Sequence, residues 1–336
     1  MLADIANEQA KTNRVTVIIG NDLTDDSVLG RINNRVDVKL LRRPPGSRNP
    51  RHMLKLYYML RSIRPDIAHA HLESFAKILR WLPIPKVLTV HNTGIQLSDA
   101  VKDYDAVFSI SNAVKDDLEK RYPCLESVMV PNGIVFGDVT RKSQYGQKPF
   151  RIVQVSRLDH KQKGQDILLR ALRIINDTVG SGQVYVDFIG EGGSEEYLLN
   201  IAEELDLTEW CNFLGQRSRK TIYENLHSYD LLVQPSRYEG FGLTVVEAMA
   251  ALLPVLVSNV EGPMEIIDRG KYGYFFETDD HRDCAEQIME IMKMSSQPGF
   301  TEVRQAVAES MKSKYDVSFT AKAYLEEYEN VIKVKK

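Results

Sequence analysis

Short apolar segments alternate with helical patterns along this chain, and that alternation constrains its fold more than any other feature. The apolar segments of the first part lie at 15–19, 36–41, 67–71, 87–91, 106–111 and 128–130. The pattern restarts with apolar segments at 152–156, 185–190, 212–214, 231–234 and 254–258. Strands that alternate with helices are typical of a parallel sheet covered by helices on both faces. We therefore expect an α/β protein with two Rossmann-like domains and a cleft between them.

A polar stretch separates the two series of segments. Residues 137–149 are polar, weakly patterned and end in proline, which is typical of an interdomain linker. We expect an N-terminal domain over 1–140, a linker over 141–149 and a C-terminal domain over 150–316. The remaining residues, 317–336, have the pattern of an amphipathic helix. Its apolar stripe contains Phe319, Tyr324, Leu325, Tyr328 and Ile332.

Composition excludes several classes of protein. At 336 residues, the chain is long enough for two ordinary domains, and its 43% hydrophobic and 26% charged residues are those of a soluble globular protein. A net charge of −3 argues against a general nucleic-acid binder. No apolar run is long enough to cross a bilayer, and we expect no signal peptide. Cys124, Cys211 and Cys284 are widely spaced, which favours reduced thiols in a cytoplasm.

A single charged residue, Glu247, interrupts the apolar run between Gly240 and Asn259. The run predicts a buried helix followed by a buried strand. Because an unpaired buried carboxylate is costly, Glu247 needs either a protein partner, such as a neighbouring Arg, or a ligand. A glycine turn that begins at Glu239 leads into this helix, and the amides of a first helical turn favour an anion. Two glutamates around such a turn indicate a site for one elongated anionic ligand.

The run RYEGFGLTVVEAMA, which holds both glutamates, resembles the glycosyltransferase family 4, the retaining group 1 transferases of the GT-B fold. The resemblance implies that Glu239 binds hydroxyls of a donor sugar and that Glu247 binds ribose hydroxyls. It implies that a diphosphate is held by the backbone amides of Gly240, Phe241, Gly242 and Leu243. It also implies that the helix over 317–336 crosses back to the first domain.

Two cations follow the apolar segment at 152–156. Arg157 comes directly after it, and Lys163 stands at the start of the next helical pattern. Open α/β sheets bind ligands just beyond the carboxyl ends of their strands, so both side chains are candidates for binding an anion. The alternative is a pair of solvated cations at a loop. The order V-S-R-L…K-G is similar to the family's phosphate-binding positions, which implies that Arg157 and Lys163 contact the leaving diphosphate.

Three other positions complete the expected site. The resemblance implies that His91, at the end of the segment 87–91, faces the donor sugar across the cleft. Gly190 and Gly192 lack the third glycine of a dinucleotide-binding motif, and we interpret them as a turn near the nucleotide base. No metal site is expected: Asp103 and Asp105 form a D-x-D pair, but they precede a strand instead of following one, which indicates a strand-entry turn. His69 and His71 form an H-x-H pair on one face of a strand, but no third metal ligand is evident in the sequence.

A basic segment covers residues 39–64, which contain no acidic residue. Its cations are Lys39, Arg42, Arg43, Arg48, Arg51, Lys55, Arg61 and Arg64. Leucines and tyrosines lie between them, a mixture that suits docking on an anionic membrane surface or on a phosphorylated acceptor. An ordinary solvated basic face is the alternative. If the first reading holds, the protein is peripheral on the inner face of the cytoplasmic membrane.

We therefore expect a metal-independent, retaining hexosyltransferase without a cofactor. It would move a sugar from a nucleotide-diphosphate donor, with a UDP-sugar expected, to a hydroxyl of a sugar or lipid-linked acceptor in cell-surface polysaccharide or lipopolysaccharide synthesis. Compared with the family, we expect the first domain to lack the opening strand and glycine-rich loop. We expect a gap in the first sheet, or direct pairing of the strands at 15–19 and 67–71. The alternatives are a nucleotide-sugar epimerase and a catalytically silent nucleotide-sugar-binding protein.

Overall fold

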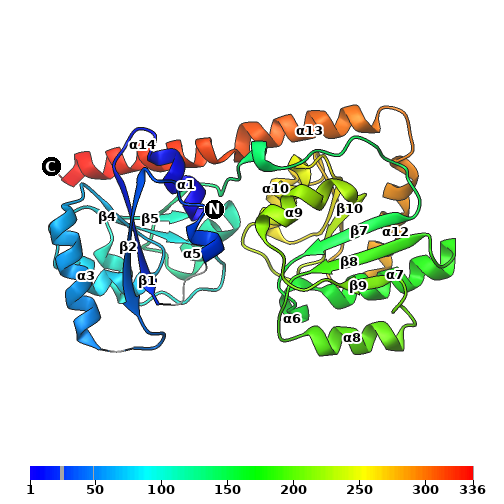
Figure 1. Ribbon diagram of the computed structural model, residues 1–336, viewed down its shortest axis with the longest axis horizontal. Helices are drawn as coiled ribbons and strands as arrows, with labels where there is room; N and C mark the ends of the chain where they lie inside the picture. The colour runs from blue at the N-terminus through cyan, green and yellow to red at the C-terminus, as the bar shows by residue number, and fades with distance from the viewer. Residues whose placement is uncertain (23–25, 48, 336) are drawn as a thin grey trace. The chain divides into compact units, whose positions relative to one another are not determined.

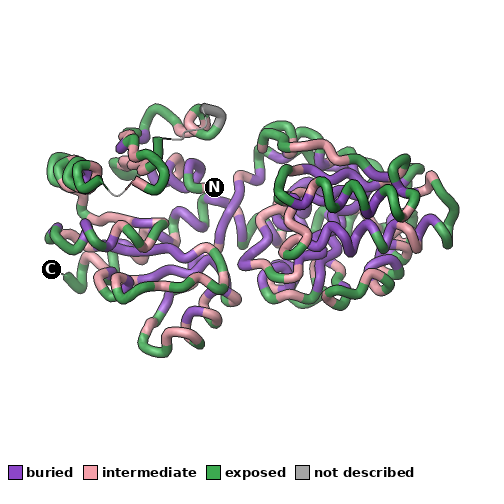
Figure 2. The backbone as a smooth tube through the Cα atoms, turned by 90° about the horizontal axis from the view of Figure 1, so that it is seen from below, coloured by how far each residue is buried: buried purple, intermediate pink, exposed green. Residues whose placement is uncertain are grey.

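The computed structural model describes residues 1–22, 26–47 and 49–335, and the chain divides into two units (Figure 1). Unit 1 consists of Met1–Ile134 and Tyr315–Lys336, and unit 2 consists of Val135–Lys314. Each unit contains parallel strands and helices, so the predicted α/β fold with two Rossmann-like domains is confirmed. In each unit the buried backbone is concentrated in the interior (Figure 2).

Unit 1 contains two separate parallel sheets. Its strands are β1 (Val15–Asn21), β2 (Val36–Arg43), β3 (Ala68–Ala70), β4 (Lys86–Val90), β5 (Ala106–Ser109) and β6 (Ser127–Met129). Its helices are α1 (Leu2–Gln9), α2 (Asp26–Leu29), α3 (Pro50–Ile63), α4 (Ala76–Leu79), α5 (Asn112–Arg121) and α14 (Val317–Lys335), with short 3-10 turns η1 (Glu73–Phe75) and η2 (Asp99–Asp103). One sheet pairs β1 with β2, and the other has the order β3-β4-β5-β6.

The division of the unit 1 strands takes the first of the two predicted forms, a gap. Among the described residues, β1 pairs with β2 alone and β3 pairs with β4 alone, so β1 and β3 share no ladder. The residues of β1 up to Gly20 are only partly buried, whereas all of β4 is buried. β1 is therefore less buried than a central strand of an α/β sheet, which helices cover on both faces.

Unit 2 contains one six-stranded parallel sheet with the order β12-β11-β10-β7-β8-β9. The strands are β7 (Phe150–Val155), β8 (Val184–Ile189), β9 (Cys211–Phe213), β10 (Leu231–Gln234), β11 (Val255–Ser258) and β12 (Tyr274–Phe276). The helices are α6 (His160–Lys163), α7 (Gln165–Val179), α8 (Glu195–Glu204), α9 (Arg219–Asn225), α10 (Leu243–Ala250), α11 (Glu261–Ile266), α12 (His281–Met294) and α13 (Phe300–Tyr315), with 3-10 turns η3 (Phe136–Asp138) and η4 (Leu226–Ser228). Leu168 and Leu172 of α7 pack with Phe188 of β8 and Ile288 of α12 in a fully buried core.

The segment predicted as a linker differs from that prediction. The chain leaves unit 1 after Ile134, and residues 141–149 belong to unit 2. Lys142 Nζ forms a buried ion pair with Asp230 Oδ1 at 3.0 Å, and Tyr145 Oη donates to the carbonyl of Leu252 at 2.6 Å. Polar composition suggested an exposed connection, but a polar side chain with a buried partner is fixed as firmly as an apolar one.

Helix α14 packs in unit 1. Its residues Tyr324 and Tyr328 are buried, and the Tyr324 hydroxyl lies 3.1 Å from Thr89 Oγ1 of β4. The predicted apolar stripe is therefore partly right, but Phe319 is 50% exposed. No helix in the described ranges has the length and apolar character that crossing a membrane requires.

Candidate functional site

The candidate site lies at the carboxyl ends of the unit 2 strands. Arg157 follows β7, Gly190 follows β8 and Glu239 follows β10, and the carboxyl ends of parallel strands meet at one edge of a sheet. The structure thus brings together residues that the sequence marked separately. The predicted amide site at Gly240–Leu243 is the turn that enters α10, where Gly242 has a φ of +107°, a conformation that favours glycine.

Glu239 forms an ion pair with Lys163. Lys163 Nζ lies 2.5 Å from Glu239 Oε2, and Gln234 Nε2 donates to the same oxygen at 2.9 Å. The side chains of Lys163 and Glu239 are 14% and 12% exposed, so little water screens their attraction. The two groups predicted to bind the leaving diphosphate and the donor sugar are therefore direct neighbours, 76 positions apart in the chain.

Lys163 ends α6, a single helical turn that is closed by Gly164. Gly164 has a φ of +66°, and an added Cβ would lie 1.9 Å from the carbonyl oxygen of Pro235. Only glycine allows this approach, so α6 packs against the segment that leads to Glu239. Gln154 Nε2 donates to the carbonyl of Lys163 at 2.8 Å and fixes the end of the turn from β7.

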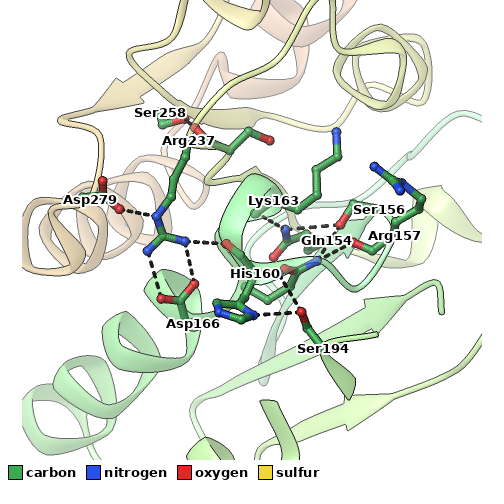
Figure 3. Close-up of polar contacts among 12 residues, drawn as sticks. Gln154, Ser156, Arg157, His160, Lys163, Asp166, Ser194, Arg237, Ser258 and Asp279 are labelled. Carbon is green, nitrogen blue, oxygen red and sulfur yellow. Dashed lines mark hydrogen bonds and ion pairs between the residues drawn. The ribbon is translucent and has the colours of Figure 1, made fainter. Parts of the chain in front are cut away.

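Arg157 is 71% exposed, with its Nη2 2.9 Å from Gln162 Oε1. Figure 3 shows the Arg157 and Lys163 side chains extending on the same side of α6. Two cations that extend together from a strand end and a helix end suit an anion with two phosphates. Their predicted roles stay predictions.

Gly190 and Gly192 have a structural reason beyond the predicted turn. An added Cβ on Gly190 would lie 1.9 Å from the carbonyl oxygen of Ser156, and one on Gly192 would lie 2.4 Å from that of Leu158. The loop after β8 therefore packs its backbone directly on the turn that carries Arg157. These glycines hold the Arg157 turn in place, and a contact with a base stays a prediction.

Glu247 accepts a hydrogen bond from a tyrosine. Tyr223 Oη of α9 donates to Glu247 Oε1 at 2.9 Å, and the Arg219 guanidinium lies 4.6 Å from the Tyr223 ring centre. Burial, followed by the charge of Glu247, raises the pKa of Tyr223, so its hydroxyl keeps its proton and remains a donor. The sequence indicated that Glu247 needs a partner, but no pattern pointed to Tyr223.

His91 follows β4 in unit 1, next to a second histidine. His91 Nε2 lies 3.0 Å from His71 Nδ1, so the N–H of one ring donates to the nitrogen of the other. Burial lowers the pKa of His91, and burial together with the charge of His91 lowers the pKa of His71 to about 3. Both rings are therefore neutral near pH 7.

The remaining candidates for metal binding have structural partners. His69 lies between Tyr328 Oη at 2.6 Å and Thr89 Oγ1 at 2.7 Å, while Asp105 accepts from the backbone amide of Lys86 at 2.8 Å and pairs with Lys335. Asp105 is thus the strand-entry residue that the sequence indicated. In the part of the chain that the structure describes, no group of three His, Cys, Asp or Glu side chains is arranged to hold a metal ion.

Comparison with known proteins identifies the family. The sequence profile described as "Glycosyl transferases group 1" matches residues 138–313, and the profile described as "Glycosyltransferase Family 4" matches residues 1–136. The chain is a group 1 glycosyltransferase of family 4. This glycosyltransferase is 25% identical over 296 residues to a glycogen synthase of Mycobacterium tuberculosis, a match that covers 79% of this chain and 70% of that protein.

Two solved structures show the same fold as this glycosyltransferase. HepE of Anabaena, in complex with UDP and glucose, matches with a TM-score of 0.79 and 20% identity over 97% of this chain and 94% of that one. The lipopolysaccharide outer core galactosyltransferase WaaB, in its apo form, matches with a TM-score of 0.74 and 17% identity over 100% of this chain and 95% of that one. Both matches cover nearly the whole length of the chain.

Several residues that contact predicted site residues of this glycosyltransferase were not found from the sequence. Among the described residues they include His71, Gln154, Tyr223 and Gln234, while Arg237 binds the turn that carries Lys163. His71 was visible as part of an H-x-H pattern, but it was considered only as a metal ligand. The others belong to ordinary helix and strand patterns, and their contacts join positions that are distant in the chain, which local spacing does not reveal.

Proposed function

We propose that this glycosyltransferase moves a hexosyl group from a nucleotide-diphosphate sugar, with UDP as the expected nucleotide, to an acceptor hydroxyl with retention of configuration. The observation that carries the proposal is the Lys163–Glu239 pair beside Arg157 at the carboxyl edge of the unit 2 sheet. The solved HepE structure contains UDP and glucose, which supports a nucleotide-sugar donor for a chain with this fold.

The proposed chemistry is mainly electrostatic. When the bond between the sugar and the diphosphate breaks, negative charge grows on the leaving phosphate oxygen. Arg157, Lys163 and the backbone amides at the start of α10 stabilise that charge, and their effect is greatest in the transition state. Glu239, held by Lys163 and Gln234, orients the sugar hydroxyls. We further propose that the leaving phosphate accepts the proton of the acceptor hydroxyl.

Glu247 and His91 complete the proposal. Glu247 binds the ribose hydroxyls, with its carboxylate oriented by Tyr223. His91 contacts the donor sugar as a neutral ring, since its pKa is lowered by burial. The two cations and the backbone amides can neutralise the diphosphate without a metal ion, so we propose a metal-independent reaction.

Kinetics of Lys163 and Arg157 variants test this mechanism. Lys163→Ala and Arg157→Ala should each lower kcat by roughly ten- to a hundred-fold, the scale of a lost hydrogen bond to a charged group of about 1.5–3 kcal/mol, and raise the donor KM less. Lys161→Ala, which removes an exposed cation from the same turn, is the matched control and should leave kcat unchanged. Equal losses in all three variants would reject the assignment, and complete loss of activity with a chelator would reject the metal-free reaction.

The products of the same assay separate the alternatives. Labelled sugar that moves to an acceptor supports transfer, whereas label that stays on the nucleotide with an inverted centre would indicate an epimerase. Binding without turnover would indicate a silent binding protein. Because WaaB is described as a lipopolysaccharide outer core galactosyltransferase, we propose cell-surface polysaccharide or lipopolysaccharide synthesis as the process and test sugar and lipid-linked acceptors first.

We also propose that α3 docks on the anionic inner face of the cytoplasmic membrane. Its exposed face carries Leu54 and Tyr58, 59% and 62% exposed, between Arg51, Lys55 and Arg61. Apolar and aromatic side chains between cations suit a lipid headgroup layer. Part of the predicted basic segment has internal roles, since Arg43 donates to the carbonyl of Ser47 and Lys55 to that of Leu41. Arg48 lies outside the described residues.

Vesicle binding tests the membrane proposal. Replacing Arg51, Lys55 and Arg61 by Gln should weaken binding to vesicles that contain anionic lipid, and the difference should shrink as salt rises. Replacing Lys115, Lys120 and Arg121 of α5 by Gln removes the same charge from another helix of unit 1 and is the control. Equal binding by both triple variants would leave α3 as a solvated basic face.

A further inference from the structure

Arg237 joins four segments of unit 2 around α6. Its guanidinium binds Asp166 of α7 through two parallel bonds, with Nη1 and Nη2 each 2.9 Å from a carboxylate oxygen. Its Nε lies 2.6 Å from Asp279 Oδ1, in the loop before α12. Nη1 also donates to the carbonyl of His160, the first residue of α6. Figure 3 shows Arg237 at the centre of these contacts.

The main chain of the same residue holds the same turn. The backbone amide of Arg237 donates to the carbonyl of Gln162 at 2.8 Å. Together with the Gln154 bond to the carbonyl of Lys163, three of the four carbonyls of α6 have partners from outside the helix. A single helical turn has little stability of its own, so these external bonds decide where its side chains point.

The contacts of Arg237 connect α6 with Glu239. Arg237 precedes Glu239 by two residues, and Lys163, the last residue of α6, reaches Glu239 Oε2 at 2.5 Å. The side chain of Arg237 lies on the opposite side of α6 from Lys163 and Arg157 (Figure 3). One residue therefore holds the turn that carries Lys163 and the segment that carries Glu239 in fixed register, from a place where it does not contact the diphosphate site.

We propose that Arg237 is a positioning residue that sets the orientation of Lys163 toward the diphosphate. The proposal rests on the proposed role of Lys163. A planar guanidinium bridges Asp166, Asp279 and a carbonyl at once, because its donors point in fixed directions; an ammonium group has the same charge but cannot span them. Arg237→Lys thus keeps the charge and removes the bridge.

A double-mutant cycle on nucleotide binding tests this inference. UDP, ADP and GDP are titrated into the parent by calorimetry, and the tightest is then measured with Arg237→Lys, Lys163→Ala and the double variant. We expect Lys163→Ala to weaken binding about ten-fold or more, the scale of a lost bond to a charged group, and Arg237→Lys to weaken it less, about five-fold. The double variant should bind within about two-fold of Lys163→Ala, since Arg237 acts through Lys163.

Two further variants separate positioning from stability. Arg151→Lys removes another contact of an Arg with a buried Asp in unit 2, the 3.0 Å bond from Arg151 Nη2 to Asp187 Oδ2, outside the predicted site. It should lower Tm and leave nucleotide binding equal to that of the parent. Asp279→Asn changes only the exposed partner of Arg237, 58% exposed, and should fold normally with binding weakened about two-fold, again only when Lys163 is present.

Each outcome decides one point. Losses that multiply in the double variant, or parent-like binding by Arg237→Lys, overturn the positioning role. If Arg237→Lys does not fold, the cycle of Asp279→Asn with Lys163→Ala takes its place, and the absence of coupling there overturns the inference. If the parent protein binds none of the three nucleotides, both the proposed function and this inference are rejected. If the parent binds a nucleotide but the effects of the variants are not coupled, only this inference is rejected.

Discussion

The three histidines of unit 1 are expected to make its stability depend on pH. His69 is enclosed by Tyr328 and Thr89, and His71 is hydrogen-bonded to His91. Burial, reinforced by the neighbouring histidines, lowers the pKa of His69 well below its usual value and that of His71 to about 3. Burial also lowers the pKa of His91.

The direction of the effect follows from proton uptake. An unfolded chain exposes these histidines with a pKa of about 6.5, so below that pH the unfolded state binds protons that the folded state excludes. Their contribution to stability is complete above about pH 6.5 and is lost as the pH falls toward the folded-state pKa. With a folded-state pKa of about 3, His71 alone lowers the unfolding free energy by about 2 kcal/mol between about pH 7 and about pH 5.

Urea unfolding of His71→Asn measures this contribution. The amide of Asn can still bond to His91 but does not titrate, so the unfolding free energy of the variant should fall by about 2 kcal/mol less than that of the parent over the same pH range. Far-UV circular dichroism follows the whole chain, and in a Trp81→Phe background the fluorescence of Trp210, which packs against the core of unit 2, follows that unit separately.

A second histidine provides the control. His52→Asn replaces a histidine of α3, outside the cluster, and should keep the parent's pH dependence. If His71→Asn and His52→Asn lose stability equally on acidification, the titration of His71 is not linked to folding, and the reasoning from its burial is wrong.

Three further predictions concern unit 2. Glu247→Ala should weaken nucleotide-sugar binding by about 1.5–3 kcal/mol in calorimetry with an unchanged circular dichroism spectrum; equal binding would reject the ribose role. Gly164→Ala should lower Tm far more than Gly180→Ala, because both have positive φ but only Gly164 would place its Cβ 1.9 Å from a carbonyl oxygen; similar Tm values would contradict this. Lys142→Met should cost about 3–5 kcal/mol in urea unfolding by leaving Asp230 buried without its cation, and a near-neutral result would mean that the pair is solvated.

The alternation of apolar segments predicted the sheets well because a buried parallel strand must be apolar throughout, and β10 and β11 are buried at every position. The separation of β1 from β3 was also predicted, and the described residues show β1 paired with β2 and β3 paired with β4. Domain boundaries that depend on single buried contacts could not be predicted. Residues 141–149 were expected to form a linker, but they belong to unit 2, where Lys142 pairs with Asp230.

The same limit applies to the candidate site. Glu239, Lys163 and Glu247 stood out because each is a charged residue in an apolar or glycine-rich context, which local chemistry makes costly. Which partner each finds is decided by the packing of segments far apart in the chain. Tyr223, which donates to Glu247, belongs to an ordinary helix pattern, and its contact appears only when α9 packs beside α10.

The place of α14 in unit 1 has a consequence for synthesis on the ribosome. Unit 2 is a single continuous stretch, Val135–Lys314, whereas unit 1 needs Tyr324 and Tyr328 to cover β4 and His69. Translation therefore supplies every residue of unit 2 before it supplies the last helix of unit 1. The part of unit 1 that is made first therefore has β3 and β4 incompletely covered until unit 2 and then α14 have been synthesised. A nascent chain that stalls before α14 would expose that apolar surface to chaperones and to aggregation.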